Sequence, residues 1–339
     1  MNLTRITPTF PGFALALAAA GPALAQGSGT TDSTRAQRLA PVTVGVTRDA
    51  ARSAFELPFA TARITMETTR PGLRRGSVSE LLLGVPGVVV QDRGNPSQDP
   101  RLAVRGFGAR SAFGVRGVRV LRDGVPLSLP DGQTPIDWLD LETVGAIDVI
   151  RGTAAALYGN AAGGIVDFRS RAPERAPFSL STRALQGGGV MRTNVTASGV
   201  GASGDSGSVR DIGWLASMTG THGDGPRTWS RVDASSVFAR AFTKLRGTRV
   251  ELQGTHYDAP RAENTGALTS AELSRDPSLP DSLNLRKHSR KAVRQSQLAV
   301  IVSRTQGANE WTASAFASSR LLDNPLPFAV VEVDRNVAG

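Results

Sequence analysis

The chain of 339 residues carries 39 Lys and Arg against 29 Asp and Glu, which gives a formal net charge of +10 at pH 7. It has no cysteine, which excludes disulfide frameworks, zinc–thiolate sites and iron–sulfur clusters. After the N-terminal region no apolar run reaches the roughly 18 residues that a membrane-spanning helix needs. The basic residues are scattered without interleaved aromatic side chains, so we expect no nucleic acid partner.

The first 25 residues have the features of an export signal. Arg5 precedes an apolar run over 13–20, and small residues follow at Ala23 and Ala25. A cation, a short apolar region and a small-x-small site are typical of a cleaved secretory signal. We therefore predict a signal peptide over 1–25 and a mature protein that works outside the cytoplasm.

A disordered arm is predicted over 26–50. Its first part, 26–40, is rich in Gly, Ser, Thr and Gln and carries little apolar surface to bury. A short β-prone run follows without an evident local partner: Pro41, Val42, Thr43, Val44, Gly45, Val46 and Thr47. Such a strand suits addition to the sheet edge of another protein, and an ordinary first strand of the next domain is the alternative.

Residues 77–172 mix helix and strand signals and predict an α+β domain with long Gly- and Pro-rich loops. The sequence Ser77-Val78-Ser79-Glu80 predicts a capping box that opens a short helix. Asp123-Gly124 lies between two apolar runs and predicts a tight hairpin. Strands are also expected at 88–90, 102–104, 144–151 and 165–168, and a short helix at 153–158.

From 176 onward, alternation with a period of two replaces the helix signals. Leu298, Val300 and Val302 share one face of their segment, and seven strands are expected at 178–188, 191–201, 211–221, 233–244, 248–258, 290–304 and 309–321, with an irregular stretch after 322. The pattern is typical of a transmembrane β-barrel, and a soluble β-sandwich gives a similar one. Short linkers at 245–247 and 305–308 alternate with long linkers at 222–232 and 259–289, which favours the barrel.

The first of these two regions resembles the plug domain of TonB-dependent outer-membrane receptors. The most specific segments are LAVRGFGAR (102–110), VRVLRDGVPL (118–127) and IDVIRGTAAALYGNAAGGIVDF (147–168). The resemblance covers 41–175 and continues to 339 as a pattern of alternation, and the strand at 41–47 resembles the TonB box of that family. It implies a plug domain over 51–175, followed by the first strands of an antiparallel transmembrane β-barrel over 176–339.

The second region is too short for a closed barrel of this kind. It holds 164 residues (339 − 175), whereas a plugged barrel has about 22 strands and needs roughly 220 residues before any loop is counted. The sequence supplies seven or eight strands, and an open sheet edge is not tolerated in lipid. We therefore expect a fragment, the N-terminal part of a longer protein.

The resemblance implies active transport and not an enzyme, and the sequence offers no catalytic, cofactor-binding or metal-binding constellation. In the family, TonB and its inner-membrane energising complex pair with the box and pull on the plug, which lies in the outer membrane. The favoured ligand is a ferric siderophore or ferric carboxylate chelate. The alternatives are an anionic organic cofactor such as pyrroloquinoline quinone and, in another class, a passive barrel or adhesin.

Two loops carry the candidate ligand contacts. Loop 106–117 offers Arg110, Ser111, Phe113 and Arg116, and loop 128–135 offers Asp131 and Gln133. Two guanidiniums beside an aromatic ring suit a planar, multiply carboxylated anion through bidentate pairing and stacking. The alternative is that these arginines hold the plug against wall carboxylates. Plug–wall ion pairs are expected of Arg105 and Arg151, and a solvated face is expected of Asp137 and Asp140, which flank Trp138.

Overall fold

The computed structural model describes residues 43–44, 52–53, 60–66, 73–111, 114–129, 131–152, 159, 161–203, 210–307 and 309–339. The predicted signal peptide, the predicted helix at 153–158, Phe113 and five of the seven residues of 41–47 lie outside this set. Within it, no helix combines the length and the apolar character that crossing a membrane requires.

A five-stranded sheet forms the centre of the first part of the chain, which we call the plug. Its strands lie in the order β3-β8-β9-β6-β7, and β6 pairs with β9 in parallel while the other neighbours are antiparallel. The bounds are β3 Ala60–Thr65, β6 Val118–Arg122, β7 Val125–Pro126, β8 Val144–Arg151 and β9 Gly164–Ser170. Beside it lie an antiparallel pair and two short helices: β4 Val88–Gln91, β5 Arg101–Val104, α1 Val78–Leu82 and η2 Leu141–Thr143.

The core of the plug lies where β8 and β9 meet the segment before η2. Ile147, Val149 and Val166 are fully buried, and Trp138 joins the same apolar cluster. The indole Nε1 of Trp138 donates to the carbonyl of Pro135 at 3.1 Å, so the polar atom of this buried ring has a partner. Trp138 thereby fixes the segment 136–141 that carries the carboxylates discussed below.

Two local predictions in the plug have different outcomes. The hairpin at Asp123-Gly124 is confirmed, with φ of 50° and 80° at its two central residues. The prediction of a capping box at the start of α1 was wrong. Ser77 caps α1 by accepting from the Ser79 N–H, but Glu80 accepts the N–H groups of Arg74 and Arg75 at 3.0 Å each. The Glu80 carboxylate thus satisfies donors of the preceding chain instead of the cap.

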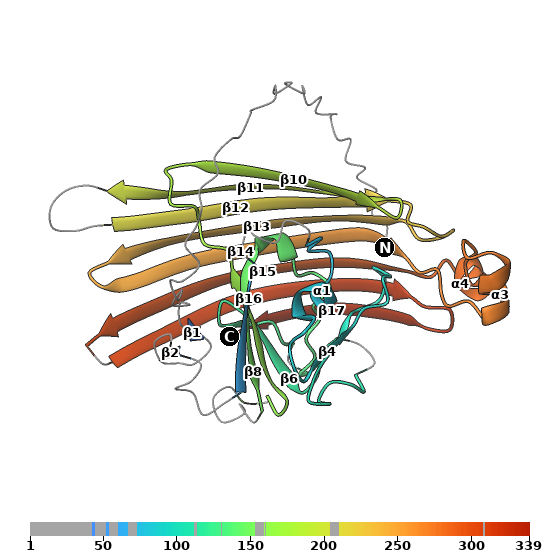
Figure 1. The fold of residues 1–339 in the computed structure, drawn as a ribbon, viewed down its shortest axis with the longest axis horizontal. Coiled ribbons are helices and arrows are strands. Elements are labelled where there is room, and N and C mark those ends of the chain that lie inside the picture. The colour runs from blue at the N-terminus through green and yellow to red at the C-terminus, as the bar shows by residue number, and fades with distance from the viewer. Residues whose placement is uncertain are drawn as a thin grey trace, which may run out of the picture. The chain divides into compact units, whose positions relative to one another are not determined.

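The second part of the chain is one antiparallel sheet of eight strands in chain order, which we call the wall (Figure 1). Its bounds are β10 Ser179–Gly187, β11 Val190–Ser203, β12 Arg210–Gly223, β13 Val232–Leu245, β14 Thr248–Glu263, β15 Arg290–Gln306, β16 Asn309–Pro325 and β17 Val330–Ala338. The seven predicted strands are confirmed, with later ends for β14 and β16. The prediction of an irregular stretch after 322 was wrong, because 330–338 alternates in burial and pairs with β16.

The two ends of the wall differ in their connections. At one end, 246–247 is a tight turn between β13 and β14, and Gly307 begins the short connection between β15 and β16. At the other end, which we call the long-loop end, the strands are joined by 224–231, 264–289 and 326–329. The loop 264–289 holds two short helices, α3 Ser270–Arg275 and α4 Ser282–Arg286 (Figure 1). The predicted alternation of short and long connections is therefore confirmed from β12 to β16, whereas 188–189 and 326–329 are short connections at the long-loop end.

The two faces of the wall have opposite chemistry. Leu180, Met218 and Leu298 are more than half exposed on the outward face. The inward face, which the plug contacts, is polar and buried, and includes Asn194, Thr196, Ser217, Thr219, Ser236, Glu251, Gln253, Gln295 and Gln297. A soluble β-sandwich buries its apolar face, whereas an apolar outward band around a polar interior is typical of a transmembrane barrel.

A pair of carboxylates lies inside the plug sheet. Asp148 of β8 and Asp167 of β9 are directly opposite in the register, and both are fully buried. Arg169 contacts both carboxylates, at 3.5 Å and 3.0 Å, and Arg63 contacts Asp148 at 3.6 Å. Burial raises the pKa of Asp167 to about 6, with Arg169 opposing this and the nearby Asp123 reinforcing it.

Because the pKa of Asp167 is higher in the folded state than the ordinary value of about 3.9, the folded plug binds this proton first as the pH falls. The plug should therefore gain about 2–3 kcal/mol from this group between pH 7 and pH 4. Asp167→Asn should be more stable than the parent at pH 7, and the difference should vanish near pH 4. Thermal unfolding across this range checks it; an equal pH slope in parent and variant would contradict it.

Candidate functional site

A buried group of four charges joins the plug to the wall. Asp99 and Asp137 come from plug loops, Lys291 from β15 and Arg320 from β16. Lys291 Nζ lies 2.7 Å from Asp137 Oδ2 and also contacts Asp99. Arg320 holds both oxygens of Asp137, at 3.0 Å and 3.3 Å, and donates to Gln295 at 3.2 Å. The plug loops are thus fixed at the long-loop end of the wall.

The two carboxylates of this group have pKa shifts of opposite direction. Burial acts to raise the pKa of Asp137, but Lys291 and Arg320 overcome it and hold that pKa well below its usual range. Burial also raises the pKa of Asp99, and the neighbouring Asp137 adds to the effect. Asp137 is therefore the fixed negative charge between the two wall cations, and Asp99 is the second partner of Lys291.

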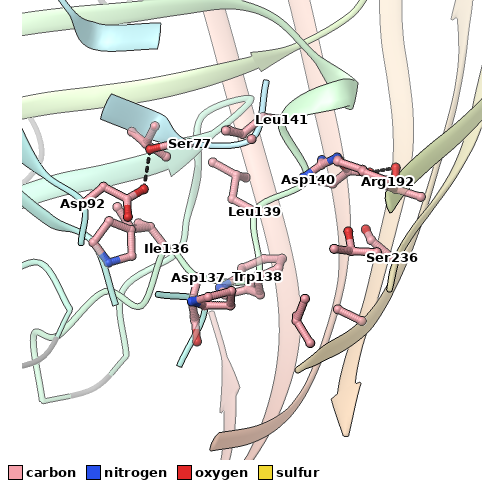
Figure 2. A pocket seen from close by; sticks show the side chains of 18 of the residues that line it. Ser77, Asp92, Ile136, Asp137, Trp138, Leu139, Asp140, Leu141, Arg192 and Ser236 are labelled. Carbon is pink, nitrogen blue, oxygen red and sulfur yellow. Dashed lines mark hydrogen bonds and ion pairs between the residues drawn. The ribbon is translucent and has the colours of Figure 1, made fainter. Parts of the chain in front are cut away.

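A second group lies where the 136–141 segment runs into η2. Asp140 accepts from Arg192 of β11 at 2.9 Å and from Thr219 of β12 at 2.6 Å. Glu142 lies 3.4 Å from Arg183 of β10. Figure 2 shows the segment between α1 and the wall, with Asp140 directed at Arg192 and Ser77 directed at Asp92. The expectation that Asp137 and Asp140 lie on a solvated face was wrong, because wall cations draw both into the interface.

Arg122 of β6 reverses this pattern of charge, since here the plug supplies the cation. Its side chain is 1% exposed, and its guanidinium lies 3.9 Å from the ring centroid of Phe238 of β13. One nitrogen donates to Thr143 Oγ1 at 2.5 Å. Burial lowers the pKa of Arg122 to about 10, which leaves it charged at neutral pH. A cation–π contact replaces a carboxylate at this point of the interface.

The structure brings together three of the predicted ligand residues. Arg116 donates to the Asp131 carbonyl at 3.0 Å and to Gln133 Oε1 at 3.4 Å, so the two predicted loops are joined to each other. The Asp131 carboxylate also pairs with Arg335 of β17 at 2.7 Å. Arg110 is exposed without an ion pair to a described carboxylate, and Ser111 is buried. Their role toward a ligand stays a prediction.

The expected wall contacts of two plug arginines also stay a prediction. Arg151 donates to the carbonyls of Pro86 at 2.8 Å and Thr61 at 3.4 Å, both within the plug. Arg105 is exposed and has a φ of 49°. Sequence reasoning missed the carboxylates that do meet the wall. The available signal was the row of cations at inward positions of the predicted strands, which require negative partners: Arg183, Arg192, Lys291 and Arg320.

Two cavities open between plug and wall. The first, of about 550 Å³, lies between α1, the 136–141 segment and strands β11 to β14 (Figure 2). The second, of about 450 Å³, lies between the plug segments 91–101 and 129–135 and strands β15 to β17. The charged group around Asp137 borders both, so it separates two spaces in which a small molecule can be held.

Arg227 clamps two connections of the long-loop end together. Its guanidinium, from loop 224–231, donates to the Leu279 carbonyl at 2.7 Å and 3.0 Å. It also donates to the Gly266 carbonyl at 2.9 Å and to Thr265 Oγ1 at 2.8 Å. Trp229 adds a hydrogen bond to the Ser289 carbonyl and a ring contact with His288. The loops 224–231 and 264–289 therefore form one rim.

Comparisons with known proteins agree with this architecture. Residues 53–165 match the family model described as TonB-dependent Receptor Plug Domain. A hemin receptor of Yersinia pestis is 32% identical over 161 residues, which is 46% of this chain and 22% of the relative. A hemin receptor of Yersinia enterocolitica is 27% identical over 143 residues, 42% of this chain and 20% of the relative. The chain thus spans about a fifth of the length of these relatives.

Solved structures show the same fold at low identity. The ferric citrate transporter FecA in its unliganded form has a TM-score of 0.65 at 20% identity, over 88% of this chain and 46% of that one. The siderophore receptor PiuA from Acinetobacter baumannii has a TM-score of 0.59 at 14% identity, over 84% and 39%. These relatives are described as receptors and transporters, none as an enzyme.

The charged group predicts a large effect of removing one wall cation. Lys291→Met leaves Asp99 buried without a cation and Asp137 with Arg320 alone, which should destabilise the plug against the wall by about 3–5 kcal/mol. Thermal unfolding and protease protection of the plug in the purified receptor measure this loss.

Two further variants make this test specific. Arg290→Gln removes the adjacent cation, which pairs with Asp323 where both side chains are 45% exposed, and should cost less than about 1 kcal/mol. Asp99→Asn combined with Lys291→Met should recover part of the loss, because it removes the orphaned charge. Equal losses for Lys291→Met and Arg290→Gln would show that the buried group does not hold the plug.

Proposed function

We propose that this protein belongs to the TonB-dependent receptor family, whose plug-domain model matches residues 53–165, and that it takes up an iron chelate across the outer membrane with energy delivered through TonB. The observation that carries the proposal is a folded plug tied by buried ion pairs to the polar face of an antiparallel wall. Breaking such pairs is costly, so a solute passes only when work is done on the plug.

In this proposal the work enters through the strand-prone run at 41–47. TonB, with its inner-membrane energising complex, adds a strand to this run, because strand pairing uses the backbone and demands little of the side chains. The prediction that the run has no local partner was wrong, since Thr43 and Val44 pair with Ser53 and Arg52. This ladder of two residues is short enough for an incoming strand to replace.

The proposed location follows from the predicted signal peptide and from the chemistry of the outward face of the wall. The signal peptide at 1–25 exports the chain, and its cleavage leaves a mature protein outside the cytoplasm. The apolar outward face of the wall then contacts the lipid of the outer membrane of a Gram-negative cell. The long-loop end faces the exterior, because long loops lie outside and short turns lie on the periplasmic side in such barrels.

The ligand we favour is a ferric siderophore or a ferric carboxylate chelate. The relatives support an iron compound, since they include hemin receptors, a ferric citrate transporter and a siderophore receptor.

A specific observation is compatible with each of two alternatives. The exposed guanidinium of Arg110 suits any multiply charged anion, so an organic cofactor such as pyrroloquinoline quinone is the second candidate ligand. A passive barrel or adhesin also presents a wall with an apolar outer face. The buried plug–wall ion pairs argue against it, because a passive pore gains nothing from a domain fastened across its interior.

Deleting 41–47 tests the proposal. Cells that express the whole receptor without this segment should bind radiolabelled ferric chelate at the surface but lose uptake, because the plug receives no work. As a matched control, deletion of 28–34 removes seven residues of the same arm and should leave uptake intact. Equal uptake by the parent and both deletions would favour a passive pore and overturn the proposal.

A further inference from the structure

The second cavity has two sides of different chemistry. It lies at the long-loop end, between the plug and strands β15 to β17, with a volume of about 450 Å³. The wall side combines three cations, each paired with a plug carboxylate, with an apolar group that consists of Leu322, Leu326, Phe328, Val331 and Val333. The plug side is polar and carries Arg93 and Arg101. The cavity is therefore amphipathic.

The apolar group of this cavity lies on the inward face of the last two strands of the wall. Leu322 is paired with Val333 and Asn324 with Val331, which places one apolar ladder on the inward face of β16 and β17. Two residues closer to the middle of β16, Arg320 lies on the same face and forms an ion pair with Asp137. Apolar groups that line an aqueous interior gain free energy when a ligand covers them. Phe328, which is 85% exposed, extends this surface at the tip of its turn.

The plug side supplies two positive charges that the wall does not neutralise. The three wall cations at this cavity, Lys291, Arg320 and Arg335, each contact a plug carboxylate. Arg93 donates to Gln98 at 2.8 Å, and neither Arg93 nor Arg101 has an ion pair to a described carboxylate. Arg101 is paired with Gln91 across β4 and β5, so it lies on a regular strand and not on a loop. Two guanidiniums thus remain for an anion.

We propose that this cavity selects ferric chelates that carry both a carboxylate and an apolar arm. The carboxylate pairs with Arg93 and Arg101, and the arm covers Leu322, Val333 and Phe328. A fully polar chelate such as ferric citrate uses only the cationic side, and a neutral chelate uses only the apolar side. This inference rests on the proposed function, and it names the class of chelate within it.

A matched pair of ligands tests the apolar half. Two ferric citrate–hydroxamate chelates with identical head groups carry either acetyl or octanoyl arms. The whole receptor in outer-membrane preparations should bind the octanoyl chelate at least about tenfold more tightly, because the longer arm covers the apolar ladder. Phe328→Ala, at an exposed turn, and Leu322→Ala should each reduce this preference about threefold or more. Leu321→Ala, the outward neighbour, should leave it unchanged.

A second comparison tests the cationic half. Arg93→Gln combined with Arg101→Gln should weaken both chelates about tenfold or more, and methyl esterification of the free carboxylate should cause a similar loss in the parent. The esterified chelate should bind parent and double variant equally, since the charge that the arginines recognise is gone. Arg275→Gln, an exposed cation of α3 outside the cavity, serves as the control and should have no effect.

The outcomes separate this inference from the proposed function. Equal affinity for the two arms, or no effect of Leu322→Ala and Phe328→Ala, overturns the amphipathic site even if uptake still depends on 41–47. Loss of affinity on Arg93→Gln and Arg101→Gln that persists with the ester overturns the carboxylate contact. Tight, arm-dependent binding without any uptake by the parent keeps the site and overturns the transport proposal.

Discussion

A buried polar face requires a partner for each of its charges, and in this protein the plug supplies the partners of Lys291 and Arg320, whereas Arg240 pairs with Glu251 within the wall. The wall directs lysine and arginine side chains inward, where Lys291 and Arg320 are 6% and 4% exposed. Such charges are tolerated only when opposite charges and hydrogen bonds accompany them. The carboxylates of the loops around Asp99 and Asp137 meet this need, so plug and wall are complementary in charge as well as in shape.

The same requirement explains how the plug is built. Its apolar core lies between the central sheet and Trp138, and Asp137 and Asp140 flank that buried ring on the same segment. At Arg122 the plug presents a cation instead, and the ring of Phe238 in the wall contacts its guanidinium. The 136–141 segment therefore has two faces: its apolar side chains belong to the plug, and its acidic side chains belong to the interface.

The strands could be predicted from the sequence because the period of two is a local property. Each wall strand alternates within its own nine to seventeen residues, and the hairpin at Asp123-Gly124 is encoded in two adjacent positions. The ends of β14 and β16 were placed too early, because both strands continue into polar sequence that still pairs with its neighbours. Strand pairing depends on the backbone, whereas the sequence pattern follows only the side chains.

The candidate site could be predicted only in part, because its contacts are long-range. Asp99 and Lys291 are 192 positions apart, and Asp137 and Arg320 are 183 apart. A sequence window around Asp137 contains neither cation, so the carboxylate was assigned to solvent. The two predicted loops do meet, since Arg116 donates to the carbonyl of Asp131 and to the side chain of Gln133. The packed structure determines which of these charged side chains pair with residues of the loops themselves.

At the rim of the long-loop end, the contacts that hold the loops together differ from the side chains that form the exposed surface. Arg227 holds loop 264–289 chiefly through the carbonyls of Gly266 and Leu279, and every residue type offers a carbonyl. The side chains of α3 and α4, including the exposed Leu273, are not part of this attachment. Mutation can therefore change the exposed side chains of this rim while the guanidinium of Arg227 keeps the two loops together.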